Sequence, residues 1–186
     1  MSVYKNPEMD KIVAIDSNHA FLTTALVSCR KPQNILEFGF GSGESCRSIL
    51  NGLRYNGNNF NFTLVDNWYD FQGIPPTEIE KEDYLGVNFI TSGESEYVYS
   101  CKEKYDFIFS DADHFNTQEW FVYVYENLLK KEGVLIYHDV TNSASFPNLL
   151  RIYSDTIRCN FHHMLFNYNT RADEKCDRGL LVIFKH

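Results

Sequence analysis

The chain has 186 residues, a formal net charge of −8 at pH 7, 44% hydrophobic residues and 23% charged residues. The length and composition predict one globular domain over residues 1–186, and the acidic charge argues against a nucleic-acid substrate, whose phosphates bind clustered Lys and Arg. No apolar run approaches the ~20 residues of a membrane span, and we expect no signal peptide. The five scattered cysteines lack C-x-x-C pairs, which favours reduced thiols and a cytoplasmic location.

Apolar, strand-like runs alternate with helical patterns in the first half of the chain. A helix is expected over residues 17–30, stopped by Pro32, so that residues 1–32 form a helical segment ahead of a core of residues 33–186. We expect strands at residues 34–38, 60–65 and 87–91, and helices at residues 43–55 and 94–103. Between the second and third of these strands lies an aromatic-rich loop with a short acidic helix near residues 77–84.

The second half continues this alternation and adds two final strands. Residues 105–110 form an apolar run. Asn116 and Glu119 then have the spacing of a capping box, which predicts a helix from there to about residue 131, closed by Gly133. We expect further strands at residues 134–137, 161–168 and 179–185, and a helix at residues 147–158 that opens on a proline. The pattern predicts an α/β fold in which a mostly parallel sheet is covered on both faces and ends in an antiparallel hairpin.

Three glycines follow the first expected strand directly, in the stretch Asn34-Ile-Leu-Glu-Phe-Gly-Phe-Gly-Ser-Gly-Glu44. Gly39, Gly41 and Gly43 permit a tight turn and let a ligand lie against bare backbone beside the amides of a helix. The third glycine comes one residue too early for the G-x-G-x-x-G fingerprint of dinucleotide-binding proteins. This spacing disfavours a nicotinamide-dependent dehydrogenase.

The pattern E-x-G-x-G-x-G resembles motif I of the class I S-adenosylmethionine (SAM) methyltransferases, and the order of elements extends the resemblance over residues 33–185. Two stretches, YDFIFSDADH at residues 105–114 and GVLIYHDV at residues 133–140, are similar to the cation-dependent O-methyltransferases of the catechol, caffeoyl-CoA and sugar types. The resemblance implies a Rossmann-like three-layer sandwich with a seven-stranded sheet. It also implies SAM as cofactor and methylation of a small-molecule or sugar hydroxyl, with a divalent cation (Mg²⁺ or Mn²⁺) as a possible aid.

Candidate cofactor-binding residues follow the first three strands. Asp66 ends the second strand, where a carboxylate can accept both ribose hydroxyls of an adenosine; the alternative is a solvated turn residue. The resemblance places Glu37 beside the methionine portion of SAM or the loop around it, and the loop of Gly39, Gly41 and Gly43 would hold the cofactor. It places the turn Ser92-Gly93-Glu94 beside the adenine, and a plain helix cap at Ser92 is the alternative there.

Candidate metal ligands follow the fourth and fifth strands. Parallel neighbouring strands bring their carboxyl ends to one rim, where Asp111 meets His138 and Asp139. The resemblance gives Asp111 to the metal; otherwise it is a cofactor-side acid in a metal-free site. Mg²⁺ prefers oxygen ligands, whereas imidazole suits Mn²⁺, Fe²⁺, Ni²⁺ or Zn²⁺ better. Consecutive strand residues point to opposite faces, so His138 and Asp139 can both ligate only if the chain bends after Tyr137, and Asp139 ranks first.

Candidate catalytic residues are His114 and Asp111. His114 lies at the offset where the catechol type has its catalytic lysine, and an unperturbed pKa of ~6.5 suits a general base near neutral pH; a surface histidine is the alternative. Asp113 is either a further acid of the site or a turn former. The aromatic residues Trp68, Tyr69 and Phe71 either wall an acceptor pocket or belong to the core.

The acceptor itself is not readable from the sequence, but a small molecule is expected. The short segment ahead of the first helix predicts a homo-oligomer, because a partner subunit can complete the acceptor site. Two alternatives stay open. One is a metal-independent enzyme that methylates nitrogen or a macromolecule, and the other is a non-catalytic SAM-binding regulatory partner.

Overall fold

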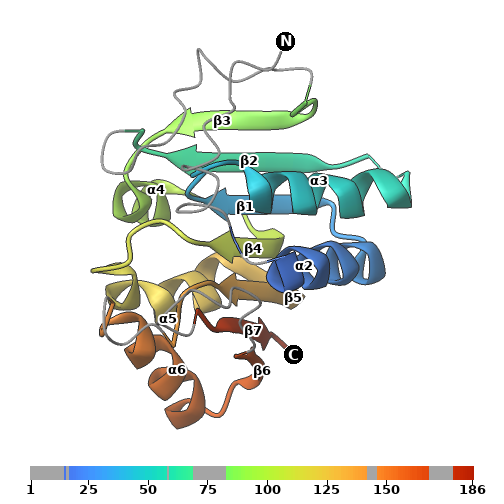
Figure 1. Cartoon of the computed structure of the whole chain (residues 1–186). Helices are drawn as coiled ribbons and strands as arrows, with labels where there is room; N and C mark the ends of the chain where they lie inside the picture. Colours follow the sequence, from blue (N-terminus) through green and yellow to red (C-terminus); the bar gives the residue numbers. More distant parts are fainter. Residues whose placement is uncertain (1–14, 16, 58, 69–82, 142–145, 168–177) are drawn as a thin grey trace.

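The computed structural model describes residues 15, 17–57, 59–68, 83–141, 146–167 and 178–186. These residues form one seven-stranded sheet with the strand order β3-β2-β1-β4-β5-β7-β6 (Figure 1). The strands are β1 (Asn34–Phe38), β2 (Asn61–Asp66), β3 (Val87–Thr91), β4 (Tyr105–Ser110), β5 (Leu129–Tyr137), β6 (His162–Phe166) and β7 (Leu180–Phe184). The first five strands pair in parallel, and β7 is antiparallel to both β5 and β6. The mostly parallel sheet and its terminal hairpin are therefore confirmed.

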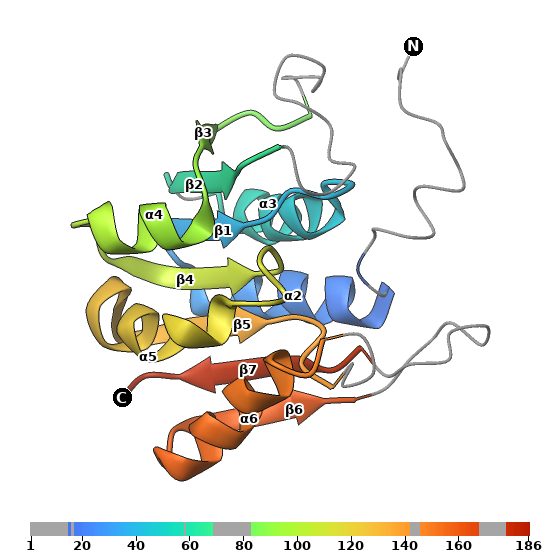
Figure 2. The same ribbon diagram turned by 90° about the vertical axis from the view of Figure 1, so that its left-hand side faces the viewer.

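Helices cover both faces of the sheet, which gives the expected three layers (Figure 2). On one face lie α2 (Ser17–Arg30) and α3 (Glu44–Asn56). On the other lie α4 (Glu94–Ser100), α5 (Phe121–Tyr123) and α6 (Leu149–Arg158). None of the helices in the described part of the chain has the length and apolar character needed to cross a membrane.

The central strands divide their side chains between two buried clusters. In β4, Phe107 and Phe109 pack against the layer of α2 and α3, whereas Ile108 packs against the layer of α4, α5 and α6. Burying each of these side chains fully contributes ~1.5–3 kcal/mol. Successive strand residues point to opposite faces of the sheet. The packing of these core residues therefore fixes which helical layer the first residue after each strand faces.

The helix expected from Asn116 to about residue 131 is confirmed only in part, because the helical segment is irregular and ends at Leu128. The chain forms a 3₁₀ turn at Thr117–Glu119, the short α5, and a π-helical turn (η2) at Val124–Leu128, after which β5 begins. The Asn116 amide donates to the carboxylate of Asp113, and that carboxylate also accepts the backbone N–H of Phe115 and of Asn116. This local turn competes with a helix cap at Asn116, so the capping box does not form.

The far end of the same segment also differs from expectation. Gly133 lies within β5 and does not close a helix. Instead, the ammonium group of Lys185, next to the C-terminus, donates to the carbonyls of Tyr125, Glu126 and Leu129. A side chain distant in sequence thus satisfies carbonyls left without partners where the helical segment ends. The expected acidic helix at residues 77–84 lies mostly outside the described residues.

Candidate active site

The carboxyl ends of β1, β4 and β5 lie side by side at one rim of the sheet. The register pairs Phe38 with Ser110, and Ser110 with Tyr137. Two further ladder bonds extend it beyond the strand ends: Asp111 N donates to the Phe38 carbonyl over 3.0 Å, and His138 N donates to the Ser110 carbonyl over 3.1 Å. The residues that follow the two strands are therefore held in place by backbone hydrogen bonds.

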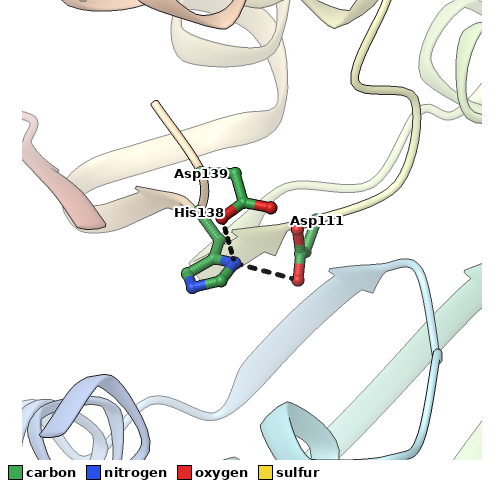
Figure 3. A group of neighbouring side chains, drawn as sticks. All are labelled: Asp111, His138 and Asp139. Atoms are coloured by element: carbon green, nitrogen blue, oxygen red, sulfur yellow. Dashed lines mark ion pairs between the residues drawn. The ribbon is translucent and has the colours of Figure 1, made fainter. Parts of the chain in front are cut away.

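Asp111, His138 and Asp139 form a cluster at this rim, with one possible ligand atom from each lying within 4.8 Å of the others (Figure 3). Phe109 and Ile136 face α2 and α3, so alternation directs Asp111 and His138 to that same face. Asp139 would point to the opposite face, but its backbone has a left-handed φ of 59°. The bend after Tyr137 that joint ligation requires is present.

Opposite charges dominate this cluster. His138 Nδ1 lies 3.2 Å from Asp111 Oδ2 and 3.5 Å from Asp139 Oδ1. Burial favours the neutral imidazole, but the two carboxylates outweigh it and raise the pKa of His138. Burial likewise opposes ionisation of Asp111, yet His138 and His114 hold the pKa of that carboxyl well below its usual range. The cluster is therefore built around two carboxylates and a compensating positive charge.

The donor atoms of the cluster fit a divalent cation. Asp111 Oδ1, His138 Nδ1 and Asp139 Oδ1 are buried and make no hydrogen bond of acceptable geometry, although charged neighbours lie at ion-pair distance. A buried polar atom without a hydrogen bond costs about 1–3 kcal/mol. Two carboxylate oxygens and one imidazole nitrogen are ligands that manganese, iron, cobalt, nickel and zinc accept readily.

His114 lies directly on the cluster. Its Nε2 is 3.0 Å from Asp111 Oδ1 and 3.4 Å from Asp139 Oδ2, and its Nδ1 is 2.7 Å from the Ala112 carbonyl. Burial lowers its basicity, but the close carboxylates of Asp111 and Asp139 raise the pKa of His114 to about 10. In this arrangement the ring is an imidazolium at neutral pH, and it has no lone pair with which to accept a proton.

His19 and Arg178 also reach the cluster, and the sequence did not indicate either. His19, on α2, lies behind His138, with its Nδ1 3.2 Å from His138 Nε2. Burial, together with His138, lowers the pKa of His19 to about 4. Arg178 precedes β7, and its Nε lies 3.7 Å from Asp139 Oδ1. Both residues come from segments far from β4 and β5 in sequence and carry no motif, so only tertiary packing reveals them.

The glycine loop between β1 and α3 packs against the end of β4. Gly39, Gly41 and Gly43 all have positive φ, at 87°, 51° and 76°. A Cβ added at Gly39 would lie 2.4 Å from the Asp111 carbonyl oxygen. Only glycine allows this close approach, so the loop and the acidic cluster are in direct backbone contact.

Asp66 anchors the glycine loop to the end of β2. Its Oδ2 accepts the Phe40 N–H over 2.7 Å, and its Oδ1 accepts the Trp68 N–H over 2.6 Å. A carboxylate has about four acceptor positions, so Asp66 retains capacity for ribose hydroxyls. Trp68 packs against Phe40 and Phe89, whereas Tyr69 and Phe71 lie outside the described residues.

Glu37 is buried under the first turn of α3. The Ser45 hydroxyl donates to Oε1 over 2.5 Å, while Oε2 makes no hydrogen bond. Burial raises the pKa of Glu37 to about 8, so the group is a neutral carboxylic acid at pH 7. The Glu37 side chain therefore lies in the protein interior, and its Oε2 can still form a hydrogen bond.

The residues of the turn after β3 lie in two different environments. Gly93 precedes α4 without any side-chain cap, and the Ser92 hydroxyl donates to the Gly93 carbonyl, so the plain cap at Ser92 does not form. A Cβ at Gly93 would meet no atom within 4 Å, which leaves open space beside the backbone. Glu94, in contrast, is buried and accepts hydrogen bonds from Ser110 and Thr117. Its carboxylate braces the end of β4.

Asp113 proves to be a turn former. Its carboxylate accepts the N–H of Phe115 and Asn116, and its own N–H donates to Glu94 Oε2 over 3.1 Å. A shallow surface depression lies beside this turn. Its lining includes Asp111, His114, Tyr137, His138 and Leu149.

A family model described as a methyltransferase domain matches residues 36–140. The matched segment covers more than half of the chain and contains the glycine loop, Asp66, Asp111, His114, His138 and Asp139. No curated protein sequence matches the chain.

Solved structures match nearly the whole chain. An O-methyltransferase from Bacillus cereus in complex with S-adenosylhomocysteine (SAH) is 18% identical, with a TM-score of 0.74 over 98% of this chain and 93% of that one. The O-methyltransferase TomG from Streptomyces achromogenes in complex with SAM is 15% identical, with a TM-score of 0.73 over 94% of this chain and 82% of that one. A Staphylococcus aureus protein assigned as a caffeoyl-CoA O-methyltransferase is 20% identical, with a TM-score of 0.70 over 97% of this chain and 90% of that one.

At such identities these structures establish the shared fold, and the domain match adds the family. The chain belongs to the methyltransferase-domain family.

Proposed function

We propose that the protein transfers a methyl group from SAM to a hydroxyl group of a small molecule, aided by a divalent cation at Asp111, His138 and Asp139. The proposal rests on one observation, the direct contact between the glycine loop and the cluster of Asp111, His138 and Asp139. The Gly39 backbone packs on the Asp111 carbonyl, so a cofactor loop adjoins a cluster suited to a cation. The likeness to O-methyltransferases solved with SAH or SAM supports the same assignment.

The cofactor would lie along the ends of β1, β2 and β3. Gly39, Gly41 and Gly43 would offer backbone to its methionine portion, and Asp66 would accept hydrogen bonds from the ribose hydroxyls while it holds the loop through Phe40 N. Glu37 would lie beside the methionine portion or the loop around it, and Ser92 and Gly93 would lie beside the adenine. Glu94 would contribute only indirectly, because its carboxylate is occupied by internal donors.

The acceptor would lie at the ends of β4 and β5. Asp111 and Asp139, with His138, would hold the cation, which when bound polarises a coordinated hydroxyl and favours its ionisation. Asp139 remains ranked above His138, because a carboxylate suits a wider range of cations. By fixing both substrates on adjacent strand ends, the protein would supply proximity and alignment for in-line displacement.

His114 would act as the base once its ion pairs with Asp111 and Asp139 are replaced. Those two carboxylates are what raise the pKa of its imidazole to about 10. When they no longer hold the proton, Nε2 can accept one from the acceptor hydroxyl, while Nδ1–H stays on the Ala112 carbonyl over 2.7 Å and fixes the ring. Positioned bases of this kind contribute roughly 10²–10⁴-fold to rate.

A metal-independent methyltransferase is the second candidate. It is favoured by one observation, the position of His114 Nε2 within ion-pair distance of both Asp111 and Asp139. An imidazolium there would supply the positive charge otherwise provided by a cation. Methyl transfer that is unchanged by chelators and by added Mn²⁺ or Mg²⁺ would favour this candidate.

Calorimetric titration with SAH tests the cofactor assignment, with wild type, Asp66→Ala and the control Asp155→Asn. Asp155 pairs with Arg158 on α6, which lies towards the opposite edge of the sheet from β2 (Figure 1). We expect saturable SAH binding by wild type and by Asp155→Asn, and a loss of binding in Asp66→Ala. A wild-type protein that is folded but binds neither SAH nor SAM would contradict the proposed function.

Four further properties are part of the proposal: a small-molecule acceptor in place of nucleic acid, a homo-oligomer, a cytoplasmic location and a single domain over residues 1–186. The net charge of −8 supports the first of these. Light scattering at several protein concentrations tests the second, and a monomer with and without SAH would contradict it.

A further inference from the structure

His138 is held from two sides within the protein interior. Its Nδ1 faces the carboxylates of Asp111 and Asp139 (Figure 3), and its Nε2 lies 3.2 Å from Nδ1 of His19. Both histidines are 2% exposed. The two rings are nearly perpendicular, at 82°, with centroids 5.2 Å apart. This edge-on arrangement is that of a hydrogen bond between two ring nitrogens.

The position of His19 is fixed by α2. His19, Thr23 and Val27 are the buried residues of this helix and recur every four positions, which places them on one face. That face packs towards the sheet, where Val27 belongs to the same core as Phe109 and Ile136. His19 also lies outside the segment that matches the family model. His19 therefore reaches the strand ends from a part of the chain that precedes the matched segment.

A single hydrogen can lie between the two facing nitrogens. A neutral imidazole carries one N–H, and the other nitrogen has the lone pair that binds a metal. If Nδ1 of His138 offers its lone pair to a cation, its hydrogen must be on Nε2. The Nδ1 of His19 is then the acceptor of that hydrogen. The geometry of the pair is thus compatible with ligation by His138 through Nδ1, which is the nitrogen that faces the two carboxylates.

We propose that His19 is a positioning residue that makes His138 a nitrogen ligand. It accepts the Nε2–H of His138 and so holds Nδ1 towards the space between Asp111 and Asp139, and the site then selects cations that accept nitrogen, such as Mn²⁺, Co²⁺ or Zn²⁺, over Mg²⁺. The inference rests on the cation site of the proposed function.

The selectivity follows from ligand chemistry. Mg²⁺ demands near-octahedral oxygen coordination, whereas first-row transition metals bind imidazole well. The hydrogen-bond partners of metal-ligating histidines fix the tautomer and the ring orientation, and their loss typically lowers metal affinity 10–100-fold. Loss of the His19 contact should therefore weaken binding of Co²⁺ or Mn²⁺ far more than binding of Mg²⁺.

Metal titrations of the full chain test this inference, with Mn²⁺, Co²⁺ and Mg²⁺ as the probes and calorimetry and the Co²⁺ absorption spectrum as readouts. The variants are His19→Ala, His19→Asn, which places an acceptor oxygen near the position of Nδ1, and the control His163→Ala. His163 lies on β6, where its Nδ1–H donates to the Phe161 carbonyl over 2.8 Å and its ring packs against Tyr153. The control removes a histidine without touching the cluster.

We expect His19→Ala to lower Mn²⁺ and Co²⁺ affinity roughly 10–100-fold, with His19→Asn within a few-fold of wild type and His163→Ala unchanged. Equal affinities of wild type and His19→Ala would overturn the inference. So would equal weakening in the Ala and Asn variants, which would indicate packing, or equal weakening for all three cations, which would indicate a general distortion.

A second measurement needs no variant at position 19. Long-range nitrogen–proton NMR correlations of the Zn²⁺-loaded wild type report the tautomer of His138, and we expect the hydrogen on Nε2. A hydrogen on Nδ1 would overturn the inference. SAH binding, measured on the same samples, separates the two proposals: wild type that binds SAH but no cation overturns only the inference and the cation part of the function, whereas wild type that binds no SAH contradicts the methyltransferase assignment itself.

Discussion

The two halves of the strand rim are built in different ways. In the half at β1 and β2, backbone groups dominate: Gly39 has a positive φ, and the Asp66 carboxylate is occupied by the N–H groups of Phe40 and Trp68. In the half at β4 and β5, side-chain charges dominate, and Asp111 Oδ1 and His138 Nδ1 are buried without a hydrogen bond. The first half is held in shape mainly by backbone hydrogen bonds, whereas the second is suited to an added cation.

The two halves therefore differ in what determines their structure: backbone conformation in the first and the balance of charges in the second. A loop fixed by its φ angles and backbone hydrogen bonds is pre-organised for a ligand, so ordering it on binding costs little free energy. A cluster of buried carboxylates, in contrast, destabilises the folded protein unless a positive charge pairs with it. Changes in the first half should therefore act through the shape of the loop, and changes in the second through the balance of charge. The following variants are arranged from the largest expected effect to the smallest.

Asp111→Asn should have the largest effect, because it removes a carboxylate while it keeps the shape of the side chain. A cation supplies several kcal/mol of charge stabilisation to such a reaction, so we expect loss of cation binding and at least ~10²-fold lower methyl transfer. SAH affinity should change little. The check is calorimetry with Mn²⁺ and with SAH on the same sample. Unchanged cation binding would show that Asp111 is not a ligand.

Gly39→Ala should destabilise the fold and disturb both halves at once. Its Cβ would lie 2.4 Å from the Asp111 carbonyl, at a backbone φ of 87°. We expect ~3 kcal/mol lower unfolding free energy, from left-handed strain of about 1–2 kcal/mol and the clash. Gly57→Ala is the matched control, because Gly57 has a φ of 65° and a Cβ there meets nothing within 4 Å. Equal losses in urea denaturation would refute the close-packing argument.

Glu37→Gln should flatten the dependence of stability on pH. The pKa of Glu37 rises from 4.5 to about 8 on folding, so the native state holds a proton that the unfolded state releases between these values. The corresponding stability is full below pH 4.5 and is lost as pH rises to about 8, with a slope of at most ~1.4 kcal/mol per pH unit. Urea midpoints of wild type and variant at several pH values measure the difference. Parallel pH curves would contradict a neutral Glu37.

Asp66→Asn should have the smallest effect of the four. The amide keeps one acceptor oxygen but loses the other, so one of the two backbone hydrogen bonds to Phe40 N and Trp68 N is broken. A hydrogen bond to a charged group contributes ~1.5–3 kcal/mol, and we expect at least about tenfold weaker SAH binding. Calorimetry measures it, and an unchanged affinity would remove Asp66 from the cofactor site.

The sequence predicted the frame of the site because the frame is local. The helix Ser17–Arg30 and the strands Asn34–Phe38, Val87–Thr91 and Tyr105–Ser110 match their expected bounds, since each apolar run is flanked by residues that stop it. The convergence of Asp111 with His138 follows from parallel neighbouring strands, and the bend at Asp139 was identified as a condition. The cap at Asn116 was mispredicted, because Asp113 forms a competing turn.

The remainder of the site depends on contacts between distant segments. His19 reaches His138 across 119 residues of sequence, and Lys185 closes the helical segment before β5. Glu94 was placed beside the cofactor, but its burial against Ser110 and Thr117 depends on how α4 packs against β4. No periodicity or spacing in one sequence encodes such contacts.

The most direct measurement is the binding of Mn²⁺ to the protein saturated with SAH, followed by the electron paramagnetic resonance signal of the free ion. We expect a saturable site in wild type and in Asp155→Asn, and its loss in Asp111→Asn. A folded, SAH-bound wild type without a saturable Mn²⁺ site would contradict the claim that the charged half of the rim holds a cation beside the cofactor loop.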